Sequence, residues 1–354
     1  MTSDNMTIGM NDSVLVTGAT GFIGLKVVEN LLERGFHRLR CFARPSGATD
    51  KLQKILSQVG GTARVEIIKG NLLCREDCVK AAKDVSVIYH LAAGTSEKSI
   101  PDAFMNSVVT TRNLLEASVQ HTRLKRFVNT SSFTVYSNVG KPSRRLLNEA
   151  CPIEQNPEFY GDAYCYAKVK QDELVQEYGK KYGIPYVIVR PGSVYGPGKK
   201  QITGRIGIDT FGMFLHLGGS NPIPFTYVDN CADAIVLAGL VTGIDGEVFN
   251  IVDDDLPSSR RFLRLYKRRV RKFRSLYIPR SISYLLCTLW EQYAIWSEGQ
   301  LPPAFSRRRW RAEMKKTYYT NDKAKKLLGW KPKVSMEEGL RCFFHSCRES
   351  AYDA

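Results

Sequence analysis

A tyrosine and a lysine stand four residues apart in the segment YCYAK, which runs from Tyr164 to Lys168. In a helix this spacing places both side chains on one face. A free phenol has a pKa of about 10 and exchanges protons poorly at neutral pH, whereas a nearby ammonium stabilises the phenolate and lowers that pKa. We therefore predict a general acid/base that carries a proton for a carbonyl/alcohol pair. Tyr166 and Lys170 have the same spacing, so the pattern needs support from other residues.

A run of hydroxyl side chains provides that support. Thr130, Ser131 and Ser132 directly follow the apolar run Phe127 to Asn129, which is typical of a buried strand. In α/β folds, ligands bind at the carboxyl ends of the strands. A hydroxyl at that edge can hold the substrate oxygen while Tyr164 transfers the proton. The alternative is that these side chains only complete a turn.

Glycines stand at 18, 21 and 24 in the segment TGATGFIG, between an apolar run and a helical pattern. A pyrophosphate needs close backbone, free N–H groups and the positive end of a helix, and glycines here permit all three. The alternative is a tight strand-to-helix turn without a ligand. Because strand and helix patterns flank the glycines, we predict a dinucleotide site. Its contacts are expected from Gly18, Thr20, Gly21, Phe22, Ile23 and Gly24.

The choice between NAD and NADP depends on the end of the second apolar run, which reads CFAR and closes on Arg44. An acidic residue at this position would accept a hydrogen bond from a ribose 2′-hydroxyl, whereas an arginine can hold a 2′-phosphate. Arg44 therefore favours NADP, with NAD as the second choice. The alternative is that Arg44 is an ordinary solvated side chain.

These residues need a scaffold, and the first half of the chain alternates β-branched runs with helical patterns. Near-continuous apolar runs separated by helices predict a parallel sheet covered on both faces. The expected fold is α/β, a Rossmann-type doubly wound parallel sheet. The expected strands are Val14 to Val16, Leu39 to Phe42, Val65 to Ile68, Val85 to Leu91, Phe127 to Asn129 and Val187 to Val189.

The second half predicts a smaller, interleaved lobe. Residues 191–224 are rich in Gly and Pro and predict loops, and a helix is expected to begin near Asp229. A further apolar run, Val248 to Ile251, is expected to return to the sheet. We therefore expect a Rossmann domain over 1–190, joined again by 225–252, and a mainly substrate-binding lobe over 191–354. A chain of 354 residues is too long to fold around one small hydrophobic core.

Composition excludes several classes of protein. Hydrophobic residues at 43% and charged residues at 24% are typical of globular domains, not of fibrous or disordered chains. The nine cysteines are odd in number and lack zinc-ribbon spacing, so we expect free thiols, a reducing compartment and no metal site. The polar start of the chain has no apolar core typical of a secretion signal. The expected location is cytoplasmic.

Seven segments in order resemble the extended short-chain dehydrogenase/reductase family, the NAD-dependent epimerase/dehydratase superfamily. They are TGATGFIG, HLAAG, NTSSFTVYS, YCYAK, RPGSVYGPG, YVDNCADA and LLGWKPKVSMEEGL. The resemblance implies a nicotinamide cofactor, Tyr164 as general acid/base, Lys168 bound to the nicotinamide ribose and Ser132 orienting the substrate. It also implies cofactor contacts from Asn71 and Leu72 at the adenine, from Val194 near the carboxamide, and from Leu91, Ala92, Ala93 and Pro191. Homodimers are usual among proteins that resemble this one.

Departures from the family pattern narrow the chemistry. Sugar-nucleotide dehydratases usually have Asp-Glu after the active-site hydroxyl, where this chain has Phe133 and Thr134. Elimination of water needs an extra acid and base, so dehydration is not expected. Many epimerases carry an Asn where RPGS has proline and glycine. The segment looks more like the 3β-hydroxysteroid dehydrogenase and dihydroflavonol reductase branches.

The leading hypothesis is thus hydride transfer between NADP(H) or NAD(H) and a ketone or secondary alcohol on an apolar, steroid-like or flavonoid-like small molecule. One alternative is a nucleotide-sugar epimerase that retains tightly bound NAD. Another is a non-catalytic sensor that keeps the cofactor fold.

Two segments of the second lobe suggest a surface function. Residues 260–274 hold nine basic and no acidic side chains, with an apolar face, and such a helix can rest on anionic lipid. The net charge of +16 also attracts anions, but no nucleic-acid motif accompanies it, so nucleic acid is not an expected partner. Residues 282–296 form a broad aromatic and aliphatic stripe that fits core packing, the roof of a pocket or a membrane contact.

Overall fold

Seven parallel strands form the central sheet of the computed structural model, in the order β12-β7-β5-β4-β1-β2-β3. The structure describes residues 6–58, 64–94, 99–121, 123–137, 145–160, 162–199, 203–210, 212–297 and 307–352. The strands are β1 (Val14–Thr17), β2 (Arg38–Ala43), β3 (Arg64–Lys69), β4 (Val87–His90), β5 (Arg126–Thr130), β7 (Tyr186–Pro191) and β12 (Val248–Ile251). Every strand expected from its apolar run is present, and the Rossmann-type prediction is confirmed.

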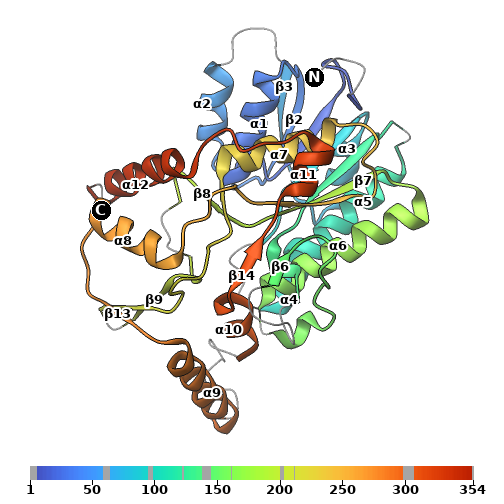
Figure 1. Ribbon diagram of the computed structural model, residues 1–354. Coiled ribbons are helices and arrows are strands. Elements are labelled where there is room, and N and C mark those ends of the chain that lie inside the picture. Colours follow the sequence, from blue (N-terminus) through green and yellow to red (C-terminus); the bar gives the residue numbers. More distant parts are fainter. Residues whose placement is uncertain are drawn as a thin grey trace.

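Helices cover both faces of this sheet (Figure 1). On one face α1 packs against α7 and α2, and on the other α5 packs against α3 and α6. The helices are α1 (Phe22–Glu33), α2 (Asp50–Gln58), α3 (Arg75–Ala82), α4 (Ile100–Ala103), α5 (Thr110–Val119), α6 (Ala163–Tyr182) and α7 (Val228–Leu240), with a π-helix η2 (Phe104–Val109) between α4 and α5. The chain order reverses between β1 and β4, and the crevice at such a reversal is where this fold binds ligands.

The strands are apolar on both sides because each sheet face has its own core. In β1, Val14 and Val16 pack with α1 and α7, whereas Leu15 packs toward the helices of the other face. All of β1 is buried. This is why the strands have near-continuous apolar runs and not an alternating pattern.

Three small sheets lie outside the central sheet, and three of their strands fall within 191–224, where the sequence predicted only loops. The small sheets pair β8 (Ser193–Tyr195) with β11 (Phe225–Tyr227), β6 (Arg145–Leu147) with β14 (Thr317–Tyr319), and β10 (Met213–His216) with β9 (Gly207–Thr210) and β13 (Ser275–Tyr277). These strands are three or four residues long, too short to show a periodic pattern.

The remaining helices and two 3-10 turns complete the fold; α8, α9 and α12 lie at the left and bottom of Figure 1, whereas α11 lies beside α7. They are α8 (Ser259–Arg269), α9 (Arg280–Trp296), α10 (Arg307–Met314), α11 (Asp322–Leu328) and α12 (Met336–Tyr352), with 3-10 turns η3 (Phe133–Val135) and η4 (Pro157–Tyr160). The C-terminal part returns to the Rossmann domain through Trp330, which is fully buried and donates from Nε1 to the Asn230 carbonyl at 3.0 Å. The described helices include none that is both long and apolar enough to span a bilayer.

Candidate active site

The glycine segment forms a turn between β1 and α1 that leaves no room for side chains. Gly18 has a φ of +68°, in the left-handed region, and a Cβ on Gly24 would lie only 2.0 Å from the Gly18 carbonyl oxygen. No side chain caps the first turn of α1, and no acidic residue lies in it. The N–H groups of that turn and the positive end of the helix dipole can therefore receive an anion. This cradle fits a dinucleotide pyrophosphate.

The segment after β4 lies against this turn. A Cβ on Gly18 would approach the Ala92 nitrogen to 3.0 Å and the Leu91 carbonyl carbon to 3.1 Å. The Ala92 N–H donates to Thr17 Oγ1 at 3.4 Å, and the same hydroxyl pairs with His90 Nδ1 at 2.8 Å. The structure thus brings Leu91 and Ala92 beside Gly18, as expected for residues that border one cofactor, and Ala93 follows them in the chain.

His90 is held by two hydroxyls, because His90 Nε2 also pairs with Thr111 Oγ1 at 2.9 Å. Burial, helped by the positive charge of Lys168, lowers the pKa of His90 to about 3. The ring is therefore neutral at physiological pH and links β1, β4 and α5. Its position in HLAAG gave no indication of this role.

The residues predicted near the adenine and ribose lie at the ends of β2 and β3. Arg44 follows β2 directly and is exposed. Asn71 is exposed just after β3, and its Oδ1 accepts from the Leu73 N–H at 3.0 Å. Leu72 is buried, and its carbonyl accepts from Asn113 Nδ2 at 2.9 Å. All three lie at the carboxyl edge of the sheet, which also carries the glycine turn.

The predicted acid/base and the predicted hydroxyl are in contact. Asp162 caps α6 by accepting from the Tyr164 and Cys165 N–H groups at 3.0 and 3.2 Å, which fixes Tyr164 in the first turn. Ser132 lies just beyond β5, where its Oγ accepts from the Thr134 N–H at 3.2 Å. The Ser132 hydroxyl also lies near enough to the Tyr164 phenol to lower the pKa of that phenol. Two segments far apart in the chain are thus joined at the positions expected to carry the chemistry.

The pKa of Tyr164 differs from the sequence-based expectation. Burial raises this pKa to about 12, and the nearby Ser132 hydroxyl offsets the increase only in part. The sequence predicted that Lys168 would lower the pKa of Tyr164, and this prediction was wrong. The spacing of two residues shows that they are neighbours, but it does not show how much water the fold removes from the phenol. The phenol is therefore protonated at neutral pH.

Lys168 lies one turn after Tyr164 and is buried. Its Nζ donates to the Thr130 carbonyl at 2.7 Å and lies 5.9 Å from the centroid of the Tyr164 ring. Burial lowers the pKa of Lys168 to about 8, and the charge of Asp172 acts in the opposite direction. The ammonium is thus directed toward the end of β5, between the acid/base and the sheet.

A buried ion pair supports this arrangement, and the sequence reasoning missed it. Asp172 Oδ2 accepts from Arg190 Nε and Nη2, both at 3.0 Å, and from Ser131 Oγ at 2.9 Å. Asp172 Oδ1 accepts from Asn129 Nδ2 at 3.0 Å. The signals were present, because Asp172 stands four residues after Lys168 and Arg190 opens RPGSVYGPG. Their pairing depends on the placement of β7 beside β5.

Lys199 is a second residue that the sequence reasoning missed. Its Nζ donates to the Val194 carbonyl at 3.0 Å and lies 5.6 Å from the centroid of the Phe22 ring. Although much of the side chain is exposed, desolvation of the ammonium lowers its pKa. Lys199 therefore connects Phe22 in the glycine turn with Val194, just after Pro191 at the end of β7.

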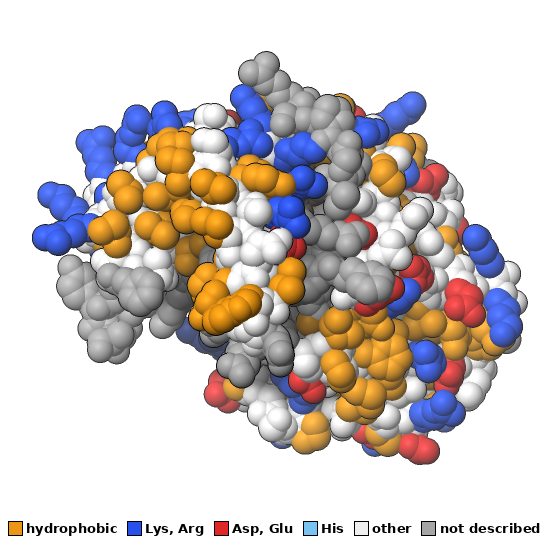
Figure 2. All heavy atoms as spheres, turned by 90° about the horizontal axis from the view of Figure 1, so that it is seen from below, with side chains coloured by type: hydrophobic (Ala, Val, Ile, Leu, Met, Phe, Trp, Pro, Cys, Tyr) orange, Lys and Arg blue, Asp and Glu red, His pale blue; other side chains and the backbone are white. Residues whose placement is uncertain are grey.

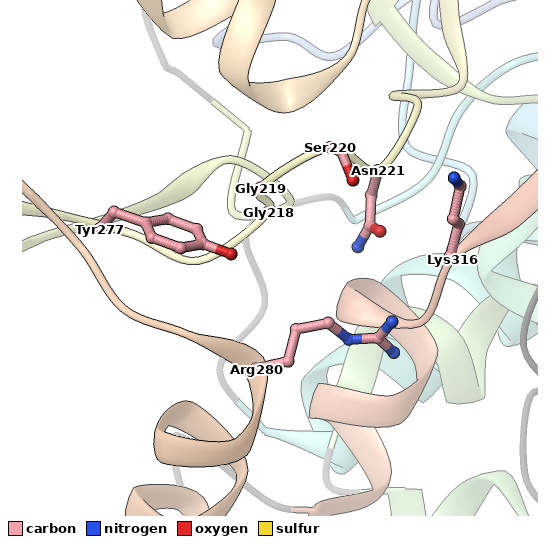
Figure 3. A pocket seen from close by; sticks show the side chains of 7 residues that line it. All are labelled: Gly218, Gly219, Ser220, Asn221, Tyr277, Arg280 and Lys316. Atoms are coloured by element: carbon pink, nitrogen blue, oxygen red, sulfur yellow. The ribbon is translucent and has the colours of Figure 1, made fainter.

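A polar pocket of about 220 Å³ lies in the second lobe (Figure 3). Two of its lining residues are cationic, Arg280 at the start of α9 and Lys316 between α10 and β14, and none of the seven is acidic. Figure 3 shows Arg280 and Asn221 extending into the space between their backbones. Asn221 Nδ2 donates to the Met314 carbonyl at 2.6 Å, which fixes the amide. The pocket suits an anionic or strongly polar group.

Comparison with known proteins supports this description. The mouse sterol-4-alpha-carboxylate 3-dehydrogenase, decarboxylating, is 25% identical over 92% of this chain and 88% of its own length. The protein of the same name from Candida albicans is 26% identical, over 93% of this chain and 95% of its own length. Among solved structures, the UDP-glucuronic acid 4-epimerase from Bacillus cereus in complex with NAD has a TM-score of 0.70 at 25% identity, covering 96% of this chain and 99% of that one.

The family assignment follows from a match to the model of a protein family. Residues 14–251, from the start of β1 to the end of β12, match the model of the NAD dependent epimerase/dehydratase family. That range contains the glycine turn, Ser132, Tyr164 and Lys168. The chain therefore belongs to the NAD dependent epimerase/dehydratase family and is an enzyme, which confirms the resemblance read from its motifs.

Proposed function

We propose that this enzyme transfers hydride between a nicotinamide cofactor and a ketone or secondary alcohol on a largely apolar, steroid-like substrate. The observation that carries the proposal is the proximity of the Ser132 hydroxyl to the Tyr164 phenol, at the sheet edge that also bears the glycine turn. Two hydroxyls joined there can both reach one substrate oxygen. The sterol dehydrogenases of mouse and Candida albicans, which match nearly the whole chain, support the steroid-like class.

In this proposal, the bound nicotinamide supplies or accepts the hydride at the substrate carbon. Ser132 positions the substrate oxygen by hydrogen bonding. Tyr164, which is protonated at neutral pH because its pKa is near 12, donates its phenolic proton to the oxygen of a ketone. In the reverse direction Tyr164 must first lose that proton, so alcohol oxidation becomes faster as the pH rises. Lys168 places a cation beside the ring and favours the phenolate when it forms.

For the cofactor, we propose NADP before NAD. The exposed Arg44 guanidinium follows β2 at the edge where a ribose 2′-phosphate would be held. Lys199 adds a second cation beside Phe22 of the glycine turn and is suited to a phosphate of the same cofactor.

The function is tested by following NAD(P)H absorbance while purified protein is offered 3β-hydroxysteroids, flavonoid ketones or UDP-sugars. Net reduction of NADP or NAD by a 3β-hydroxysteroid, lost in Tyr164→Phe, would support the proposal. Turnover of flavonoid ketones alone would retain the hydride chemistry and overturn the steroid-like class.

A second candidate, epimerisation of a nucleotide sugar, is favoured by one observation. Arg280 and Lys316 form a cationic lining in the polar pocket, and a diphosphate would fit such a lining. The structural similarity to the Bacillus cereus epimerase also favours epimerisation. An epimerase would retain NAD through gel filtration and convert a UDP-sugar without net absorbance change. That result would replace the dehydrogenase proposal.

A further inference from the structure

Helix α9 presents its large apolar side chains to solvent. Leu285 and Leu289 are each 57% exposed, and Trp296 is 77% exposed. All of the exposed large apolar positions of α9 except Ile295 follow helical spacing and so form one continuous face. They are Ile282, Leu285, Leu286, Leu289, Trp290, Tyr293 and Trp296, and we call them the α9 face.

The opposite side of α9 carries small residues and packs on the protein. Ser283, Cys287 and Ala294 are buried, at positions that alternate with the α9 face. Ser283 Oγ accepts from Trp310 Nε1 of α10 at 3.0 Å. The helix is thus attached through its small side chains, and the usual orientation of an amphipathic helix in a water-soluble domain is reversed. Core packing, one of the expectations for this stripe, is excluded for the α9 face.

Cationic side chains accompany this apolar surface, and its acidic residue is neutralised. Within α9, Glu291 is the one acidic side chain, and it accepts from Arg307 Nε at 2.5 Å. Arg311 donates to the Tyr284 hydroxyl at 2.7 Å and is exposed beside the helix. The guanidinium of Arg280 lies 5.7 Å from the centroid of the Trp310 ring. Figure 2, which looks onto the end of the molecule from which α9 projects, shows hydrophobic side chains with Lys and Arg along their margin.

The strand β13, which precedes α9, adds exposed apolar side chains to this surface, and cationic side chains stand next to it. In β13, Leu276 is 52% exposed and Tyr277 is 43% exposed. Three cations, Arg271, Lys272 and Arg274, stand immediately before this strand. The apolar surface is therefore adjoined by a basic segment that precedes it in the sequence and by the basic helix α10, which packs against α9.

Helix α8 has a different role from the one its sequence suggests. Its apolar side chains Phe262 and Tyr266 are buried against Phe343 and Phe344 of α12. They are therefore not available to lipid. The expectation that residues 260–274 rest on a membrane through their apolar face is corrected, since that face belongs to the core. The charges of α8 remain outward.

We propose that the α9 face inserts into the interfacial region of an anionic lipid bilayer, with the surrounding arginines and lysines at the headgroups. Trp and Tyr are favoured at this depth of a membrane, and Leu is favoured just below it. A second copy of the chain fits less well, because a two-fold contact would bring the same cations together. An anionic bilayer can bury the apolar side chains of the α9 face and neutralise the cations beside it at the same time. The proposal stands independently of the substrate.

The test is flotation of the full chain with two kinds of vesicle, phosphatidylcholine alone and phosphatidylcholine with phosphatidylserine. The wild type should float with the anionic vesicles and dissociate as salt is raised. The double variant Leu285→Glu/Leu289→Glu should lower the bound fraction at least about tenfold, because two leucines lose their burial in lipid.

A matched control places two glutamates on the Rossmann domain. Val119 ends α5 and is 40% exposed, and Tyr182 ends α6 and is 46% exposed. Val119→Glu/Tyr182→Glu makes the same charge change and should bind vesicles as the wild type does. Two outcomes would overturn the proposal: a wild type that floats with neither vesicle, or equal loss of binding in both double variants. Light scattering that shows dissociation of an oligomer only in the α9 variant would assign the face to a second copy instead.

Discussion

The carboxylate of Asp172 receives two hydrogen bonds from Arg190, through Nε and Nη2 to Oδ2, each 3.0 Å long. Both residues are almost completely buried. The pair joins α6 to β7, one helical turn beyond Lys168. The geometry of the proton-transfer residues therefore depends on a charge pair that lies behind them.

Replacing Asp172 by Asn should destabilise the fold strongly, because it leaves the Arg190 guanidinium buried without its counter-charge. A loss of about 3–5 kcal/mol is expected for one partner of a buried pair. Urea unfolding measures it. Asp12→Asn is the control, since Asp12 bonds Ser86 and Lys125 near the surface and should cost about 1 kcal/mol or less. Equal costs at the two positions would contradict the assigned role.

Replacing Tyr164 by Phe removes the proton carrier and keeps the ring. The turnover number should fall by about 10²- to 10⁴-fold, the usual contribution of a general acid/base. Affinity for NADPH, measured by fluorescence titration, should remain near the wild-type value. Tyr166→Phe is the matched control on the same helix and should stay near wild-type activity. Comparable losses of activity in both variants would contradict the assignment of Tyr164 as the proton carrier.

Replacing Ser132 by Ala removes the hydroxyl that opposes the effect of burial on the Tyr164 pKa. The pKa of Tyr164 should rise further, so the alkaline rise in the rate of alcohol oxidation should move to higher pH. A pH profile of kcat measures the shift. Ser131→Ala tests the neighbouring hydroxyl, which bonds Asp172 at 2.9 Å. That variant should lose stability while its pH profile keeps its midpoint.

Most of the sheet and the cofactor turn could be predicted because the signals are local. A strand buried on both faces must be apolar throughout, and β1 shows this in Val14, Leu15 and Val16. The glycine turn leaves little room for a side chain at Gly18 or Gly24, so the residue types are fixed by sterics. Such constraints act within a few residues and are visible in the sequence.

Other features depended on distances between segments that the sequence does not reveal. The direction of the Tyr164 pKa followed from burial, not from the lysine four residues later. An apolar stripe with helical spacing has the same pattern whether it faces a core or solvent, so the orientation of Leu285 and Leu289 could not be predicted. The ion pair of Asp172 required β7 beside β5.

Arg44 is predicted to select the cofactor, and Arg44→Asp tests this directly. A charge-assisted hydrogen bond to the 2′-phosphate should be lost and replaced by repulsion, so the preference for NADP over NAD should fall by about tenfold or more. The ratio of kcat/KM values with the two cofactors measures it. Arg38→Asp changes the other end of the same strand and is the control. An unchanged ratio in Arg44→Asp would remove the argument for NADP.

His90 should make the fold sensitive to mild acid. Its pKa in the folded chain is about 3, below the ordinary value of 6.5, so the unfolded chain binds the proton first. Stability from this group is fully present above pH 6.5 and is lost as the pH falls from there toward 3. Each pH unit in that window costs about 1.4 kcal/mol.

The measurement is urea unfolding at several pH values. His90→Asn should be less stable near neutral pH, because its contacts with Thr17 and Thr111 change, yet its stability should decline less as the pH falls. Substitution of the exposed His345 by Asn is the control and should retain the wild-type dependence. If His90→Asn kept the full wild-type dependence, the acid sensitivity would have to arise from the carboxylates, and the neutral ring between β1 and α5 would not be its source.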